Sequence, residues 1–132
     1  MRDRSALIIE DNRDLAIIFS QALQAAGFVT AIIEDGKQAL SRLEIVAPDL
    51  VVLDLHIPTV PGVDVLRRIR ADARLAETRV IVATTDSSVN KGLREQADLV
   101  LIKPVSFTQL RDLAARFYVT DLSLRAPTLL PR

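Results

Sequence analysis

The chain alternates short, continuously apolar runs with segments in which apolar residues recur at helical spacing. Runs that do not alternate with polar residues are typical of strands covered on both faces, and hence of a parallel sheet. The segments between them have the period of helices that bury one face. The runs that predict strands are Ala6–Ile9, Phe28–Ile33, Leu50–Leu53, Val80–Thr84 and Leu99–Ile102.

Glycine, proline and capping residues mark where the helices should begin and end. Gly27 should end the first helix, because glycine readily takes the left-handed conformation found at helix C-termini. The fourth helix should cover about Ser88–Ala97, and Ser106 and Gln109, in the spacing of a capping box, should open the fifth. The other apolar stripes are Leu15, Ile18, Phe19, Ala22, Leu23 and Ala26 in the first helix, Leu40, Leu43 and Val46 in the second before Pro48, Val63, Leu66 and Ile69 in the third after Pro61-Gly62, and Leu110, Leu113, Ala114 and Phe117 in the fifth.

Five strands alternating with five helices predict an α/β fold, a doubly wound five-stranded parallel sheet. Right-handed crossovers favour the flavodoxin-like strand order 2-1-3-4-5. Residues 1–120 should form this domain. Residues 121–132 contain two prolines and no helical stripe, so we expect a short C-terminal tail there. In sheets of this kind the ligand site lies beyond the carboxyl ends of the strands.

The composition excludes several classes of protein. The 132 residues suffice for one domain, and the absence of cysteine excludes a disulfide framework, a thiolate zinc site and a cysteine nucleophile. The chain has no net charge that would attract nucleic acid or anionic lipid. Aromatic residues make up only 4%, too few to stack on the bases of single-stranded nucleic acid. The apolar runs are too short to span a membrane, and no signal peptide is visible. We therefore expect a soluble, cytoplasmic protein that binds neither membrane nor nucleic acid directly.

Side chains capable of chemistry follow four of the five predicted strands. Each has an ordinary explanation when taken alone: Asp11 or Asn12 could cap the first helix, and Lys103 could be a solvated flank. Their joint occurrence at one edge of the sheet indicates a functional site instead. The residues are Glu10-Asp11 after the first strand, Asp54 after the third, Thr84-Thr85 at the end of the fourth and Lys103-Pro104 after the fifth.

The chemistry of this set favours phosphoryl transfer. Three crowded carboxylates repel one another, so at neutral pH they take up protons or bind a cation, and hard oxygen ligands favour Mg²⁺. An aspartate such as Asp54 can attack a phosphoryl group if the metal and the nearby Lys103 offset the repulsion between them. The hydroxyl of Thr84 could donate to a phosphoryl oxygen. No histidine or serine at another strand end suggests a hydrolytic triad.

With these residues, the sequence resembles the receiver domain of bacterial two-component response regulators, of the single-domain, chemotaxis-receiver type. The resemblance covers about residues 5–118. Pro58 and Gly62, four and eight residues beyond Asp54, match the loop that follows the acceptor aspartate in that family. The motifs that carry the resemblance are Glu10-Asp11, Asp54 in the segment DLHIPTVPG, the strand VIVATT and Lys103-Pro104.

The resemblance implies a role for each site residue. Asp54 corresponds to the phosphorylated residue and Thr84 to the switch hydroxyl. Lys103 corresponds to the lysine that binds the phosphoryl group, and the Lys103–Pro104 bond should be cis. The implied ligands of Mg²⁺ are the side chains of Asp11 and Asp54, the backbone carbonyl of His56 and, through water, Glu10.

Several positions depart from the usual pattern of the family. Val100 replaces a common aromatic residue, and Thr85 replaces the small residue after the switch threonine. His56 and Asp86 occupy variable positions that tune the lifetime of the phosphoryl group. We expect their side chains to flank the acyl phosphate, so that dephosphorylation varies with pH. The alternative is that His56 points to solvent and only its carbonyl matters.

The face formed by the fourth helix, fifth strand and fifth helix should bind a protein partner or a second copy, as it commonly does in receivers. Part of a charged network could come from Lys91, Arg94 and Asp98. If Leu99 and Leu113 are exposed, they form with Val100 an apolar patch, and association should be only weakly sensitive to salt. The other interpretation is that both leucines belong to the core.

The implied function is that of a response regulator receiver. It would accept a phosphoryl group on Asp54 from a histidine kinase or a phosphotransfer protein, with Mg²⁺ as cofactor, and signal by changing its partner-binding face. It would not be an enzyme in the usual sense, because it would catalyse only its own phosphorylation and dephosphorylation. The chain could be a stand-alone regulator or a module of a larger protein.

Three other functions are alternatives to this one. A phosphatase of the haloacid dehalogenase type needs a second aspartate where His56 stands. A flavodoxin-type electron carrier needs small hydroxyl and glycine residues where Glu10-Asp11-Asn12 would repel a phosphate. The third is a receiver-like adaptor that has lost phosphorylation, although every position of its site is filled.

Overall fold

A computed structural model describes residues 3–125, with side chains described through residue 118. Its five strands form one parallel sheet in the order β2-β1-β3-β4-β5, which confirms the predicted fold and strand order. The strands are β1 (Ser5–Ile9), β2 (Val29–Ile33), β3 (Leu50–Leu53), β4 (Arg79–Thr84) and β5 (Leu99–Ile102).

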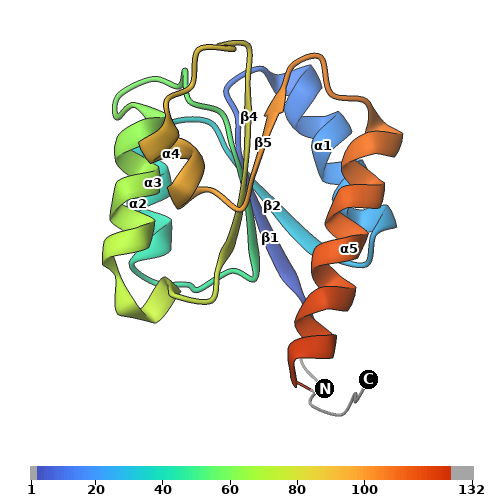
Figure 1. The fold of residues 1–132 in the computed structure, drawn as a ribbon. Coiled ribbons are helices and arrows are strands. Elements are labelled where there is room, and N and C mark those ends of the chain that lie inside the picture. The colour runs from blue at the N-terminus through green and yellow to red at the C-terminus, as the bar shows by residue number, and fades with distance from the viewer. Residues whose placement is uncertain (1–2, 126–132) are drawn as a thin grey trace.

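The helices cover both faces of the sheet, as Figure 1 shows: α2, α3 and α4 lie on one face, and α1 and α5 on the other. None of the helices within residues 3–125 could cross a lipid bilayer. The helices are α1 (Arg13–Ala25), α2 (Gly36–Leu43), α3 (Gly62–Ala71), α4 (Lys91–Gln96) and α5 (Phe107–Arg125), with a short 3₁₀ turn at Ala73–Leu75.

Two hydrophobic layers sandwich the sheet because each central strand presents apolar side chains to both faces. The layer under α2 and α3 includes Ile9, Leu53 and Leu66, and the layer under α1 and α5 includes Phe19 and Leu110. All four residues of β3 are buried, as expected for a continuously apolar strand in the middle of a parallel sheet. The covered sheet leaves its carboxyl edge free to carry polar groups.

Side-chain caps fix where most helices begin, and therefore how each loop at the carboxyl edge is held. Asn12, Asp35 and Asn90 each accept a hydrogen bond from a backbone N–H in the first turn of α1, α2 and α4. Ser106 does the same for α5, where its Oγ accepts from the N–H of Gln109 at 3.0 Å. The predicted opening of the fifth helix is confirmed.

Helix ends differ from the sequence expectation at three places. Helix α2 ends at Leu43, and the N–H groups of Ile45 and Val46 both donate to the carbonyl of Arg42 in the turn that follows. Val46 therefore lies outside the helix. Helix α4 begins only at Lys91, because Asn90 caps it there. Helix α5 continues to Arg125, beyond the expected domain boundary at residue 120, since nothing before Pro127 interrupts a helix. The rest of the expected tail, residues 126–132, lies outside the described residues.

The expected apolar patch on β5 does not form as one surface. Side chains on a strand point alternately to opposite faces of the sheet. Leu99 and Leu113 are half-buried and pack against the layer under α1 and α5, whereas Val100 packs against the opposite layer. The core interpretation of the two leucines is therefore correct. Ile102, 42% exposed, is the large apolar residue that β5 offers to solvent.

Candidate functional site

Three carboxylates from two neighbouring strands meet at the carboxyl edge of the sheet. Glu10 and Asp11 follow β1, and Asp54 follows β3, the strand paired with β1. One carboxylate oxygen from each of the three lies within 4.8 Å of the others. Glu10 and Asp54 are buried, whereas Asp11 is exposed. The parallel pairing of the strands thus places the three predicted acids together.

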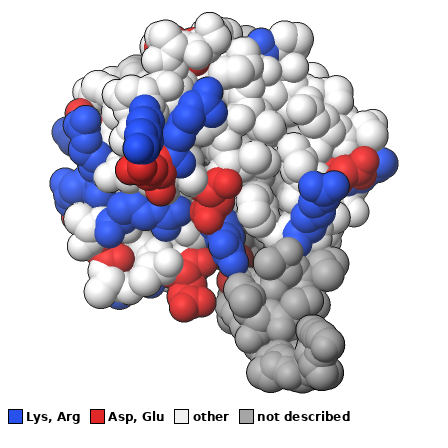
Figure 2. Space-filling model, in the orientation of Figure 1, with Lys and Arg blue, Asp and Glu red and all other residues white. Residues whose placement is uncertain are grey.

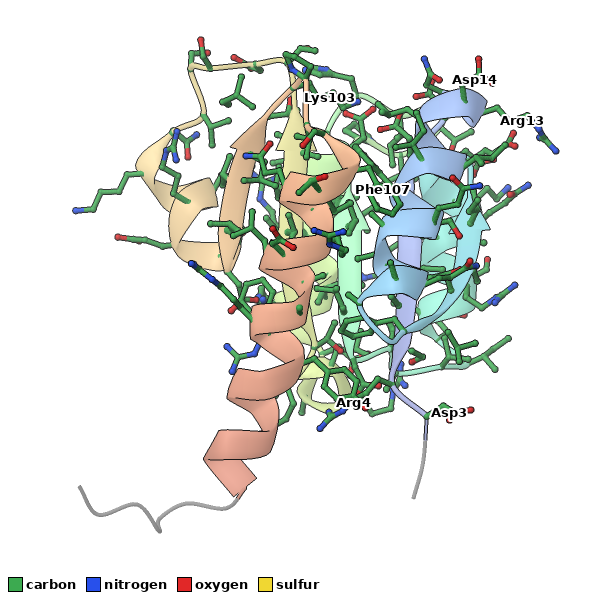
Figure 3. The ribbon with its side chains drawn as sticks, turned by 90° about the vertical axis from the view of Figure 1, so that its right-hand side faces the viewer. Asp3, Arg4, Arg13, Asp14, Lys103 and Phe107 are labelled. Atoms are coloured by element: carbon green, nitrogen blue, oxygen red, sulfur yellow. The ribbon has the colours of Figure 1, made fainter. Side chains whose placement is uncertain are left out.

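Lys103 brings a positive charge from the end of β5 into this acidic cluster. Its Nζ donates to Glu10 Oε1 at 2.8 Å and lies 3.4 Å from Asp54 Oδ2. Figure 3 shows Lys103 at the end of the sheet, above the ribbons of the strands. The Lys103–Pro104 peptide bond is cis, as the resemblance implied. The ammonium therefore bridges two of the three carboxylates.

Burial is the main influence on the pKa of Glu10. Its pKa is raised mainly because burial disfavours the charged carboxylate, and the nearby charge of Asp54 adds to this effect. The hydrogen bond from Lys103 and one from the N–H of Asn12, at 3.1 Å, act in the opposite direction. Three carboxyl groups thus meet one lysine, an arrangement that a cation would stabilise.

Thr84 lies at the carboxyl end of β4, beside the cluster. Its side chain is completely buried, and its Oγ1 accepts a hydrogen bond from the N–H of Asp86 at 3.1 Å. Its carbonyl accepts from the N–H of Lys103 at 2.8 Å, which joins the ends of β4 and β5. Thr85, the next residue, is exposed. The hydroxyl predicted to act as a switch therefore holds the start of the β4–α4 loop.

His56 and Asp86 lie close enough for their charges to interact. The backbone N–H of His56 donates to Asp54 Oδ1 at 3.1 Å, and its side chain is exposed. The pKa of Asp86 is lowered chiefly by hydrogen bonds from the hydroxyl and N–H of Ser88, and to a lesser degree by the charge of His56. That both side chains flank the acceptor stays a prediction, as does the alternative that His56 points to solvent.

The loop after Asp54 is fastened to the start of α2, which sequence reasoning missed. Thr59 has a φ of 69°, in the left-handed region, and its Oγ1 donates to Asp35 Oδ1 at 3.2 Å while accepting from the N–H of Lys37 at 2.9 Å. The N–H of Gly36 donates to the carbonyl of Pro58 at 3.0 Å. Asp35-Gly36 before a helical segment hints at a cap, but nothing in the sequence marks Thr59 as its partner.

Two glycines allow close backbone contacts around this loop. A Cβ added to Gly36 would lie 2.0 Å from the carbonyl oxygen of Val60, and one added to Gly62 would lie 2.4 Å from that of Asp54. Any larger residue would have to push the backbone apart. Gly62, which the sequence analysis matched to the family, therefore fixes the position of Asp54 by allowing α3 to approach it.

Asp98 does not join the charged network expected with Lys91 and Arg94. Its carboxylate accepts from the Nη2 of Arg70 at 2.9 Å, from the Nη1 of Arg79 at 3.3 Å and from the N–H of Val80 at 2.7 Å. These partners lie at the amino edge of the sheet, because Asp98 precedes β5. Lys91 instead approaches Glu95, 3.9 Å away on its own helix.

The residues present suit a divalent cation with hard oxygen ligands. The acidic cluster supplies carboxylate oxygens from Asp11 and Asp54, and the exposed position of Asp11 leaves room for water. Mg²⁺ prefers such a site, with few carboxylates and several waters. The described residues therefore include a group of three acids that could hold a metal ion.

Comparisons with known proteins agree with this geometry. Over 104 residues the chain is 39% identical to the DNA-binding response regulator MtrA of Mycobacterium tuberculosis, which covers 79% of this chain and 45% of MtrA. A CheY-like receiver domain from Methylobacillus flagellatus superposes with a TM-score of 0.79 at 24% identity, over 88% of this chain and 99% of that one. The receiver domain of the sensor histidine kinase PA1611 from Pseudomonas aeruginosa PAO1, solved with magnesium in its active-site cleft, has a TM-score of 0.75 at 24% identity, over 88% and 98% of the two chains.

These comparisons support different conclusions. The two structures, at less than 25% identity, support the fold. The chain spans less than half the length of MtrA. MtrA is a DNA-binding regulator, so this comparison does not support the expectation that the protein has no nucleic-acid partner. Residues 6–115 match the response regulator receiver domain. The chain therefore belongs to the receiver domains of two-component response regulators, whose general role is to accept a phosphoryl group.

Proposed function

We propose that Asp54 is the residue that accepts the phosphoryl group in this receiver. The observation that carries the proposal is the ammonium of Lys103 between Glu10 and Asp54, at 2.8 and 3.4 Å. Among the described residues, Asp54 is the acid of the cluster whose backbone is held by both the sheet and Gly62. A carboxylate fixed in this way can be aligned with an incoming phosphorus atom.

In the proposed step, a carboxylate oxygen of Asp54 forms a bond to phosphorus while the bond from phosphorus to the donor breaks. The donor is a phosphohistidine of a histidine kinase or a phosphotransfer protein, and the imidazole leaves with the electron pair. Lys103 would pair with the phosphoryl oxygens, and Thr84 would donate its hydroxyl to one of them. Turnover would be confined to the protein's own phosphorylation and dephosphorylation.

Mg²⁺ is the cofactor proposed for this site. When bound, it would neutralise negative charge on the phosphoryl group and on the carboxylates. Asp11, Asp54 and the carbonyl of His56 would hold it, with Glu10 acting through water. The structure of the PA1611 receiver, with magnesium in its cleft, supports this assignment by analogy.

The test is phosphorylation by acetyl phosphate with Mg²⁺, followed by intact-protein mass spectrometry. The wild type should gain the mass of one phosphoryl group, and Asp54→Asn should gain none. The matched control is Asp112→Asn, an exposed acid on α5 that should be labelled like the wild type. Undiminished labelling of Asp54→Asn would show that the acceptor lies elsewhere.

The partner-binding face is proposed to be that of α4, β5 and α5. Figure 2 shows charged side chains gathered over α3 and α4 and others over α5, with a mostly uncharged area between them. Ile102 is the exposed apolar residue of β5. A partner, or a second copy, would therefore be held there mainly by apolar contact, once phosphorylation repositions α4.

A further inference from the structure

Strand β2 forms one border of the sheet and has a strand neighbour, β1, on one side only. Figure 3 shows this strand, in cyan, at the margin of the molecule beyond α1. The opposite side of β2 presents backbone N–H and C=O groups without a strand partner among the described residues. Such an edge is a template for pairing with another chain.

The hydrogen bonds to β1 determine which residues of β2 point outward. Val29 donates its N–H to the carbonyl of Arg4, and Ile33 accepts at its carbonyl from the N–H of Glu10. In a parallel ladder, alternate residues direct both backbone groups to the same neighbour. Val29, Ala31 and Ile33 therefore bond to β1, and Thr30 and Ile32 direct theirs to the free side.

The free edge lacks the features that usually prevent pairing. Its sequence, VTAII, contains no charge, proline or glycine, although edge strands are commonly blunted by lysine or proline. Val29 is 57% exposed, Ile32 38%, and Ile17 of the adjoining helix α1 43%. Next to the edge is a hollow of about 180 Å³, lined by Arg13, Ala16, Ile17, Ile32 and Glu34.

We propose that β2 pairs, antiparallel and edge to edge, with β2 of a second copy of this chain. The two-fold axis passes between the two copies of Ala31. Thr30 of each copy then faces Ile32 of the other, and both residues of each such pair exchange their outward N–H···O=C bonds. This register pairs every residue of the five-residue strand, which a shift in either direction would not do.

The chemistry of the edge favours a second copy as its occupant. An isologous interface must be complementary to itself, and this one is, because its two hydrogen-bonding residues lie symmetrically about Ala31. No charged residue of β2 would meet its own copy. The charged residues that line the hollow, Arg13 and Glu34, form an ion pair with each other at 2.7 Å. The interface is small, so the dimer should be weak and dependent on concentration.

The absence of cysteine from the chain allows a direct test of the register. Two residues opposed as Ala31 would be have Cα atoms roughly 4.5 Å apart, within the range that a disulfide can bridge. We expect the single-cysteine variant Ala31→Cys to form a covalent dimer under mild oxidation. The control is Val29→Cys, on the same face and more exposed, whose copies would lie about 13 Å apart.

Cross-linking of Val29→Cys in preference to Ala31→Cys would overturn the proposal, since it would reflect exposure or another register. Introducing Ile32→Lys into Ala31→Cys should suppress the covalent dimer, because two lysines would then lie close to the axis. The control is Ile102→Lys on β5, the other border strand, which should leave the cross-link intact. Ile102 is 42% exposed and Ile32 is 38% exposed, so the two substitutions are matched in exposure.

Sedimentation across a concentration series measures the same association without cysteine. Ile32→Lys should weaken dimerisation by about tenfold or more, as like charges meet, while Ile102→Lys should not. A wild type that stays monomeric up to about 1 mM, or a dimer lost only in Ile102→Lys, would contradict the inference. Thermal unfolding checks that both variants fold. None of these measurements uses phosphorylated protein, so their outcome is independent of the role of Asp54.

Discussion

Asp86 lies on the β4–α4 loop, where the hydroxyl and N–H of Ser88 donate to its carboxylate at 2.6 and 2.9 Å. These bonds favour the charged form and so lower the pKa of Asp86 below 3.8. The stability that the Asp86–Ser88 bonds contribute is therefore fully present above pH 3.8, and it is lost as the pH falls through the lowered pKa of Asp86.

Removing the hydroxyl in Ser88→Ala should raise the pKa of Asp86 toward 3.8. A carboxyl-detected NMR titration measures this shift directly. The control is Ser87→Ala, whose hydroxyl makes none of the described bonds to Asp86. An unchanged pKa in Ser88→Ala would show that the Asp86–Ser88 bond does not form in solution.

His56 is predicted to influence how long the phosphoryl group survives. Its exposed side chain lies near enough to Asp86 to affect the pKa of that group. If both side chains also flank the acceptor, they would influence the approach of an attacking water. His56→Ala should therefore change the rate of dephosphorylation. The same rate in both proteins would mean that only the carbonyl of His56 matters.

At the scale of elements, Arg70 joins three segments that are distant in sequence. From the end of α3, its guanidinium donates to the carbonyl of Gln96 at the end of α4, to that of Thr78 before β4, and to the carboxylate of Asp98 before β5. The C-terminal end of α4 is therefore anchored. The N-terminal end of α4 follows the β4–α4 loop, whose start is held by the hydrogen bond between Thr84 and Asp86.

Arg70→Ala should lower the free energy of unfolding by about 2 kcal/mol, because it removes several charge-assisted hydrogen bonds at a half-buried position. It should also speed amide exchange in residues 91–98. The control, Arg67→Ala on the same helix, breaks an exposed pair with Asp64 and should change stability by less than about 0.5 kcal/mol. Equal effects of the two variants would show that α4 is not anchored by Arg70.

The strands were predictable because burial on both faces requires continuously apolar runs, and their order was predictable because crossovers between parallel strands are right-handed. The four strand ends that carry the site were predictable for the same reason, since Asp54 directly follows a buried run. The ends of α2 and α4 were not, because a single turn or cap decides them. The partners of Asp98 and Thr59 were not predictable either, since contacts between residues distant in sequence leave no local pattern.

At the scale of the whole molecule, recognition across α4, β5 and α5 is expected to be mainly apolar. Association of the phosphorylated protein with its partner, or with itself through this face, should change little with salt. Ile102→Asp should weaken it, whereas Ile45→Asp, at an exposed residue after α2, should not. Leu113 is not suited to this test, because it packs against the core.

Binding measured across a salt series decides between apolar and charged recognition. Association that collapses as salt rises, yet survives Ile102→Asp, would mean that charges such as those over α4 hold the partner. The Ile45→Asp control separates an effect on this face from a general effect of adding an acid to the surface.

The close backbone contacts at Gly36 and Gly62 have a consequence for how the domain can respond. These contacts leave little room for the backbone to move on the β3–α3 side of the acceptor. The β4–α4 side is instead held by single hydrogen bonds, such as that from the N–H of Asp86 to Oγ1 of Thr84. If Asp54 is phosphorylated, we therefore expect the β4–α4 side to move more than the β3–α3 side. The packing of the unphosphorylated protein would thus determine which side of the site transmits the change. Sequence change on the compliant side can then redirect the output without disturbing the chemistry.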